Sequence, residues 1–195
     1  SKDYLLGCVT NKAEQFTLPL LKSLGIIDYF GIVISGDTLE RKKPDPLPLI
    51  HGADFFNIKA NECLMLGDSV SDVKAARAAN FQIICMSYGY NHGNNIADEN
   101  PDIIINFYDF LAGIYNFWYR PKSKFICIAH QYLISHPQFT FPKGKTMDRM
   151  TLKLANHITR LNADKVLALS FQYFKESMIK NIIVTPPLLR DELLE

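Results

Sequence analysis

The chain has 195 residues, a composition ordinary for a globular protein and a formal net charge of +1 at pH 7. This near-neutral sum predicts neither nucleic-acid binding nor membrane attraction. No apolar run reaches the about 18 residues of a membrane span and no signal peptide opens the chain, so we expect a cytoplasmic protein.

The charge is unevenly distributed. Residues 1–112 carry 9 basic and 14 acidic side chains, whereas residues 113–195 carry 12 and 6, which suggests two segments of different origin. Four cysteines lie far apart and show no Cys-x-x-Cys spacing, so we expect reduced core thiols and no zinc site. They are Cys8, Cys63, Cys85 and Cys127.

Short apolar runs alternate with helical patterns over the first two thirds of the chain, which is typical of βα units and a parallel sheet. We expect strands at residues 4–9, 32–34, 63–66, 81–86 and 103–105, with the first and third of them buried. We expect helices at residues 12–24, from about residue 46, and at 73–79. The predicted fold class is α/β, a Rossmann-like parallel sheet flanked by helices, followed by a second α/β segment.

The pattern changes after residue 112, so we divide the chain into segments 1–112 and 113–195. In the second segment we expect an aromatic entry at 117–119 and strands at 125–129, 166–169 and 182–184. Residues 130–145 should be mostly loop. A helix is predicted over 146–161, with Thr146 able to cap it. It presents Met150, Leu154, His157 and Leu161 along one face. A terminal helix is expected after Pro186 and Pro187.

Two carboxylates follow the apolar run 63–66. Asp68 falls at the expected strand end, and Asp72, four residues later, comes round on the same side as the chain enters a helix. Acids placed in this way suit Mg²⁺, which usually takes one or two protein carboxylates together with phosphate and water. The alternative is a turn residue and a helix N-terminal acid favoured by the helix dipole.

Three further groups come at the ends of expected strands or shortly after them. Thr10 and Asn11 offer a hydroxyl and backbone amides that can hold phosphate oxygens. Asp37 follows the second strand, and Lys43 could neutralise charge on a transferring phosphoryl group. Each signal is weak alone, but their joint order and spacing are specific.

With these residues the sequence resembles the haloacid dehalogenase-like phosphatases and, within them, the phosphoglycolate phosphatases. The matching stretches are residues 9–12, 35–38 with 43–49, 67–69 with Asp72 and 75–79, and 88–93. The resemblance covers about residues 4–112.

The resemblance implies a Mg²⁺-dependent phosphomonoester hydrolase that acts on a small phosphorylated metabolite similar to 2-phosphoglycolate. It implies that Thr10 and Asn11 bind the phosphoryl group. Lys43 is implied as a substrate-binding and catalytic residue that stabilises the phosphorylated aspartate. Asp68 is implied as a catalytic residue and metal ligand, with Asp72 supporting the metal. Neither a nucleic-acid partner nor a particular oligomeric state is indicated.

The family's most characteristic motif, Asp-x-Asp, occurs nowhere in the 195 residues. In the family its first acid is the covalent nucleophile and its second the general acid and base. We therefore expect a core that lacks the nucleophile strand and the helical cap, with little or no phosphatase activity.

Residues from about 102 onward are similar to part of a bacterial glycosyltransferase built from two Rossmann-like domains. That likeness rests on residues 130–133, 136–137, 141–144 and 185–190. By it, His130 and His136 would line an acceptor pocket. The alternative, which we favour, is that they are loop histidines that hold backbone carbonyls. Two alternative functions therefore stay open, a glycosyltransferase fragment and a non-catalytic phosphate- or metal-binding module.

Overall fold

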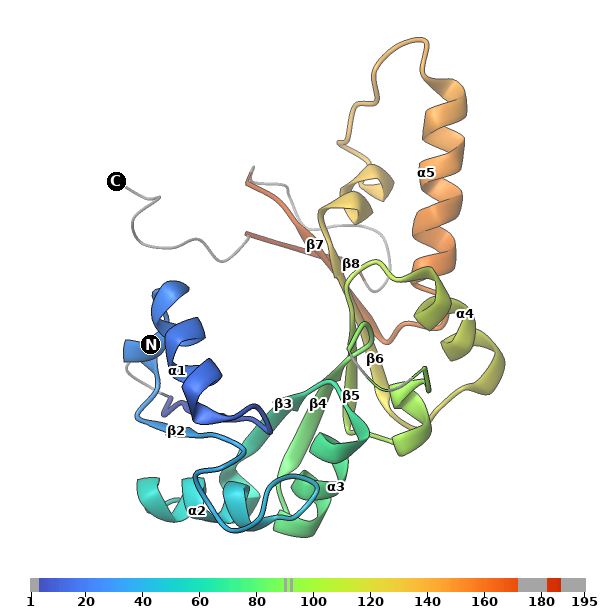
Figure 1. Ribbon diagram of the computed structural model, residues 1–195. Helices are drawn as coiled ribbons and strands as arrows, with labels where there is room; N and C mark the ends of the chain where they lie inside the picture. Colours follow the sequence, from blue (N-terminus) through green and yellow to red (C-terminus); the bar gives the residue numbers. More distant parts are fainter. Residues whose placement is uncertain (1–3, 90, 92, 172–181, 187–195) are drawn as a thin grey trace. The chain divides into compact units, whose positions relative to one another are not determined.

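The computed structural model describes residues 4–89, 91, 93–171 and 182–186. The chain forms two compact units, residues 1–85 and 86–195 (Figure 1). The division thus falls after Cys85, whereas the sequence motifs change near residue 112. The expected terminal helix after Pro186 and Pro187, and parts of the 88–93 stretch, lie outside the described residues.

Two pairs of parallel strands and three α-helices build the first unit. Among the described residues β1 pairs with β2, with Cys8 opposite Val33, and β3 pairs with β4, with Met65 opposite Ile83. The helix α3 follows β3 and packs its small buried residues, Ala75 and Ala76, inward. The elements are β1 (Gly7–Val9), α1 (Glu14–Ser23), β2 (Ile32–Ile34), α2 (Leu47–Phe56), β3 (Leu64–Gly67), α3 (Val70–Ala79) and β4 (Gln82–Met86).

All the strands expected in the first unit are confirmed, but the expectation that two of them are buried is wrong. In β3, Leu64 is 51% exposed and Leu66 59% exposed. The stretch before β1 is also open, since Tyr4, Leu5 and Leu6 are all exposed. The physical reason is that, among the described residues, β1 and β3 each have a strand partner on one side only.

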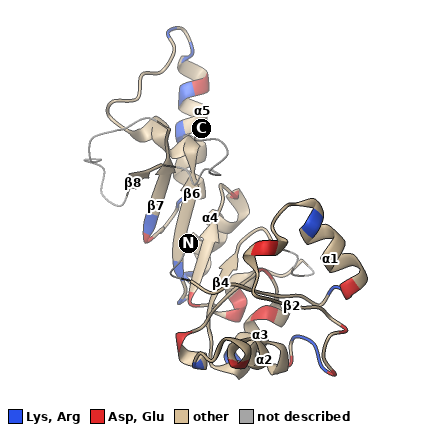
Figure 2. Ribbon diagram, turned by 90° about the vertical axis from the view of Figure 1, so that its left-hand side faces the viewer, with Lys and Arg blue, Asp and Glu red and all other residues tan. Residues whose placement is uncertain are grey.

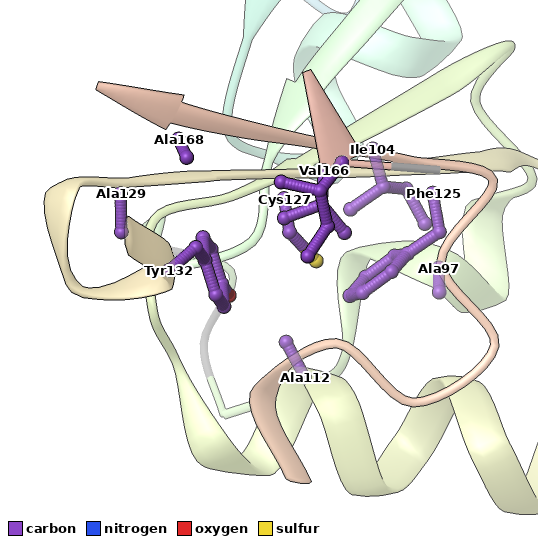
Figure 3. Close-up of a cluster of buried hydrophobic side chains, with 10 residues drawn as sticks. Ala97, Ile104, Ala112, Phe125, Cys127, Ala129, Tyr132, Val166 and Ala168 are labelled. Carbon is purple, nitrogen blue, oxygen red and sulfur yellow. The ribbon is translucent and has the colours of Figure 1, made fainter. Parts of the chain in front are cut away.

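The second unit contains four neighbouring parallel strands in the order β5-β6-β7-β8. Figure 3 shows core side chains of β5, β6 and β7 gathered on one side of this sheet, together with Ala112 of α4. The elements are β5 (Ile103–Asn106), α4 (Phe110–Tyr119), β6 (Lys124–Ala129), the 3-10 helix η4 (His130–Ser135), α5 (Thr146–Thr159), β7 (Lys165–Leu169) and β8 (Ile182–Thr185).

The strands of the second unit are confirmed, whereas one other expectation, the aromatic entry to a strand, is wrong. The aromatic stretch 117–119 lies in α4, whose N-terminal amides at Leu111 and Ala112 are capped by the Asp109 carboxylate. The span 130–145 begins with the 3-10 helix η4 and is otherwise loop, in agreement with the expectation of mostly loop. Among the described residues no helix is long and apolar enough to cross a membrane.

The helix α5 is present as predicted, but Thr146 does not cap it and its apolar face is exposed. Its buried side chains are Asn156 and Thr159. The Asn156 amide accepts a hydrogen bond from the Tyr108 hydroxyl at 2.6 Å and donates one to the Gln131 carbonyl at 2.7 Å. The Thr159 hydroxyl accepts from the Tyr132 hydroxyl at 3.0 Å. Polar contacts therefore attach α5 to the core.

Candidate functional site

The first part of the candidate site is the end of β1. The Thr10 amide donates to the Ile34 carbonyl at 2.9 Å, and the Thr10 hydroxyl accepts from the Lys12 amide at 3.2 Å. The Asn11 side-chain amide donates to the Lys43 carbonyl at 2.7 Å. Residues implied in phosphate binding are thus fixed by the backbone of neighbouring segments.

The loop after β2 approaches the β1 end closely. A Cβ atom at Gly36 would lie 2.2 Å from the Asn11 carbonyl oxygen, so only glycine fits there. The Gly36 amide donates to the Lys12 carbonyl at 2.8 Å. Asp37 accepts from the Glu14 amide at 2.8 Å and therefore satisfies an N-terminal amide of α1.

A buried ion pair joins the two halves of the site. Lys43 is 9% exposed, and its Nζ lies 2.7 Å from Asp72 Oδ1. The same Nζ donates to the Val9 carbonyl at 2.8 Å. The ammonium group is therefore held between the end of β1 and the start of α3, which brings Lys43 and Asp72 together.

Asp72 is occupied by protein contacts. Its Oδ2 accepts hydrogen bonds from the Asp68 amide at 3.1 Å, the Ser69 amide at 3.0 Å and the Ser69 hydroxyl at 2.7 Å. The contacts between Ser69 and Asp72 form a capping box at the N-terminus of α3. A Cβ atom at Gly67 would lie 2.5 Å from the Asp72 Cβ. Any larger residue at position 67 would therefore clash with the Asp72 side chain.

The surroundings of Asp72 set its protonation. Burial raises the pKa of this carboxyl, but the Lys43 charge and the hydrogen bonds from Lys43, Ser69 and the Asp68 amide outweigh burial. The net pKa lies below the ordinary value, so Asp72 is a carboxylate paired with an ammonium at neutral pH.

Asp68 differs from Asp72 because its side chain is exposed at the end of β3. No group of three or more His, Cys, Asp or Glu side chains that could hold a metal occurs among the described residues. The role of Asp68 and Asp72 in binding Mg²⁺ stays a prediction. Ser69 and Gly67 were missed as site residues, although a serine three positions before an acid is the spacing of a capping box.

An apolar cavity of about 570 Å³ lies in the first unit. Its walls include Gly7 and Val9 of β1, residues 64–66 of β3, and Leu49, Ala53 and Phe56 of α2. We call this space the strand slot, because it is bordered by strands that have one strand neighbour each among the described residues.

The two histidines proposed for the second unit differ in burial. His136 is buried, and its Nδ1 accepts a hydrogen bond from the Gln138 amide at 3.2 Å. His130 is exposed at the start of η4. Their role in an acceptor pocket stays a prediction.

A model of a known protein family matches the first unit. Residues 1–86 match the family model for haloacid dehalogenase-like hydrolases. This range nearly coincides with the first compact unit, residues 1–85. The first unit is therefore similar to a hydrolase core of this family, with the parallel strands and flanking helices of an α/β fold.

Curated relatives refine the likeness. The chain is 67% identical to a phosphoglycolate phosphatase of Nitrosococcus oceani over 54% of this chain and 47% of that protein. It is 49% identical to one from Thiobacillus denitrificans over 51% of this chain and 44% of that protein. The chain thus spans about half the length of the curated relatives it matches.

Among solved structures, a predicted phosphoglycolate phosphatase from Haemophilus somnus is similar, with a TM-score of 0.52 and 34% sequence identity. The match covers 53% of this chain and 46% of that one. The chain is thus similar to these proteins over about half of its own length.

Gly67→Ala tests the packing that holds Asp72. The new methyl group would overlap the Asp72 side chain, so we expect the substitution to lower the free energy of unfolding by about 1–3 kcal/mol. Denaturant unfolding followed by circular dichroism measures this loss. Gly52→Ala is the control, since its Cβ would make an ordinary 3.7 Å contact with Ile34 from its place in α2 and should preserve or raise stability. Equal effects of the two substitutions would contradict the close packing.

The lowered pKa of Asp72 predicts an acid-sensitive stability. A carboxyl whose pKa is depressed in the folded state stabilises the fold above its unfolded pKa of about 3.9, and this contribution is lost as the pH falls through the folded pKa. We expect the unfolding midpoint of the wild type to fall more steeply below about pH 4 than that of Asp72→Asn. Asp54→Asn, which changes an exposed acid, should follow the wild-type curve.

Proposed function

We propose that the first unit provides part of the active site of a Mg²⁺-dependent phosphomonoester phosphatase. The single observation that carries this proposal is the buried Lys43 ammonium, held by Asp72 and the Val9 carbonyl beside Thr10 and Asn11. A fixed positive charge next to a hydroxyl and backbone amides is suited to a phosphoryl group.

Each residue has a distinct role in this proposal. Thr10 and Asn11 bind phosphoryl oxygens, and Lys43 stabilises the charge that develops during transfer. The Lys43 ammonium has three N–H donors. In the contacts described, two of them are directed to Asp72 and to the Val9 carbonyl. The third can donate to a phosphate oxygen. Asp72 is a positioning residue, because it orients Lys43.

The residues fit Mg²⁺ through Asp68. Mg²⁺ binds through one or two carboxylates and fills its remaining positions with water and phosphate oxygens. The Asp68 side chain, which is exposed at the end of β3, offers such a carboxylate. Bound there, Mg²⁺ would neutralise phosphate charge.

A covalent phosphatase also needs an attacking group. The residues described at the site are Thr10, Asn11, Lys43, Asp68 and Asp72, and the family's nucleophile motif, Asp-x-Asp, is absent from the 195 residues. The strand slot offers one extended segment two neighbouring strands and an apolar lining. We propose that a strand ending in two aspartates completes the site there, beside Asp68 and Thr10.

The proposed substrate is a small phosphorylated acid similar to 2-phosphoglycolate. Support comes from the relatives named phosphoglycolate phosphatase, which the chain matches over about half of their length. Without the acidic strand, the 195 residues would bind phosphate but hydrolyse little of the phosphorylated substrate.

Phosphate binding tests the proposed roles. We expect inorganic phosphate with Mg²⁺ to bind the protein and Lys43→Ala to weaken binding by about tenfold or more, because a charged hydrogen bond is lost. Isothermal titration calorimetry measures the affinity. Thr10→Val should also weaken binding while leaving the buried ion pair intact, which covers the case in which Lys43→Ala fails to fold.

The matched control is Lys22→Ala, which removes an exposed lysine from the last turn of α1. Its phosphate affinity should equal that of the wild type. If phosphate fails to bind, or if the Lys22 and Lys43 substitutions weaken binding equally, the proposed phosphoryl site is wrong.

Complementation tests the strand slot. A synthetic peptide with about five apolar residues followed by Asp-x-Asp should bind the protein and raise its thermal midpoint. It should also produce Mg²⁺-dependent hydrolysis of 2-phosphoglycolate. A peptide of the same composition with the aspartates placed first is the control. Leu66→Lys should abolish peptide binding, because Leu66 lines the slot.

Peptide binding and hydrolysis test two different claims, the strand slot and the catalytic proposal. Peptide binding without hydrolysis would support the slot and oppose the catalytic proposal. Equal binding of both peptides, or binding unaffected by Leu66→Lys, would oppose the slot. Either result can be read beside the phosphate titration, which does not require the peptide.

A further inference from the structure

The helix α5 of the second unit carries an apolar stripe that faces away from the core. Met147, Met150 and Leu154 are 74%, 62% and 60% exposed, respectively. Their spacing of three and four residues places them on one helix face. The stripe has the pattern of a buried face, yet it is exposed.

The orientation of α5 is fixed by polar contacts on its other side. Asn156 and Thr159 are buried and hydrogen-bonded to Tyr108, Gln131 and Tyr132. The Asn106 side-chain amide also donates to the Thr159 carbonyl at 2.9 Å. Turning the helix to bury the stripe would break these bonds and leave buried polar groups unpaired, at a cost of about 1–3 kcal/mol for each group.

Basic side chains accompany the stripe. Before the helix come Lys143 and, at the N-cap position, Lys145. Within the helix, Arg149 directly precedes Met150 and Lys153 directly precedes Leu154. The single acidic residue of α5 is Asp148, which pairs with Lys145 at 3.7 Å. Figure 2 shows the blue bands of Lys and Arg along α5. The exposed helix is therefore both apolar and cationic.

We propose that α5 binds peripherally to an anionic lipid surface. The helix lies along the interface, with Met147, Met150 and Leu154 entering the boundary between headgroups and acyl chains. Arg149 and Lys153 contact anionic headgroups. An apolar stripe bordered by basic residues, on a helix whose other positions are largely polar, is the pattern of interfacial helices.

Charge favours a lipid surface over a second copy of this chain. Two copies joined through this stripe would bring their Arg149 and Lys153 side chains close together, which is unfavourable. The exposed face of α4 offers a contrast. It presents Leu111 and Trp118, but the residues from Phe110 to Tyr119 include no charged side chain. Of these two helices, only α5 combines apolar and cationic groups along its length.

Vesicle sedimentation tests the proposal on the full chain. We expect binding to vesicles of phosphatidylcholine with about 30% phosphatidylglycerol, weaker binding to pure phosphatidylcholine vesicles, and weakening by salt. Met150→Asp should reduce the partition coefficient by about tenfold or more, because it removes apolar contact and adds a repelled charge. Arg149→Glu with Lys153→Glu should remove the preference for anionic vesicles.

Thr151→Asp is the matched control, because it adds the same charge to an exposed position of α5 next to the stripe. It should bind vesicles more tightly than Met150→Asp, and circular dichroism shows whether each variant is folded. The proposal is overturned by equal binding to both kinds of vesicle or by equal losses in the two aspartate variants. It is also overturned by a dimer in sedimentation equilibrium that Met150→Asp dissociates while vesicle binding is absent.

Discussion

The ion pair between Lys43 and Asp72 is the interaction on which the candidate site depends. A buried charge is tolerated only when it is paired and hydrogen-bonded, and removing one partner of such a pair typically costs about 3–5 kcal/mol. Here the ammonium group also binds the Val9 carbonyl, while the second carboxylate oxygen caps α3 through Ser69. One pair therefore fixes the end of β1, the loop at Lys43 and the start of α3 relative to one another. Thr10 and Asp68, which adjoin these fixed points, are positioned as a result.

In this arrangement, the residues suited to binding a phosphoryl group are distinct from the residue that would attack its phosphorus atom. The fixed elements hold positive charge and hydrogen-bond donors, which is what a phosphoryl group requires from its surroundings. The attacking acid is a different requirement, since it must come from a residue beside the phosphorus atom. The sides of β1 and β3 that have no strand neighbour among the described residues border the cavity that we call the strand slot. A parallel strand placed there would end at the same edge as β1 and β3, so its last residues would face Thr10 and Asp68. The strand that we propose for the slot would therefore supply the attacking acid, while Thr10 and Lys43 would hold the phosphoryl group.

Much of the first unit could be predicted from sequence because parallel strands end at one edge of a sheet. In the structure Thr10 follows β1 and Asp68 follows β3, which lie in different sheets among the described residues, and the bonds of Lys43 to Val9 and Asp72 link the two strand ends. The direction of the Asp72 side chain could not be predicted from sequence. It depends on Lys43, which lies 29 residues away, and on the absence of a Cβ at Gly67. The exposure of Leu64 and Leu66 could not be predicted either. An apolar run indicates a buried strand, but it does not show whether another strand lies beside it. In the second unit, the aromatic residues of α4 favour strands by propensity, but Asp109 caps a helix and Gly113 lets that helix approach Thr159.

The helix α5 shows why periodicity alone does not tell which face of a helix is buried. The spacing of Met147, Met150 and Leu154 marks an apolar stripe, and burial of such a stripe is normally the largest favourable contribution to helix packing. In this unit Asn156 and Thr159 find complementary partners in Tyr108, Gln131 and Tyr132, and those directional bonds specify one orientation. Apolar contacts are non-directional and could be satisfied at several rotations of the helix, whereas each buried hydrogen bond is satisfied at only one. The polar network therefore decides the orientation, and the apolar stripe is left facing outward beside its basic neighbours.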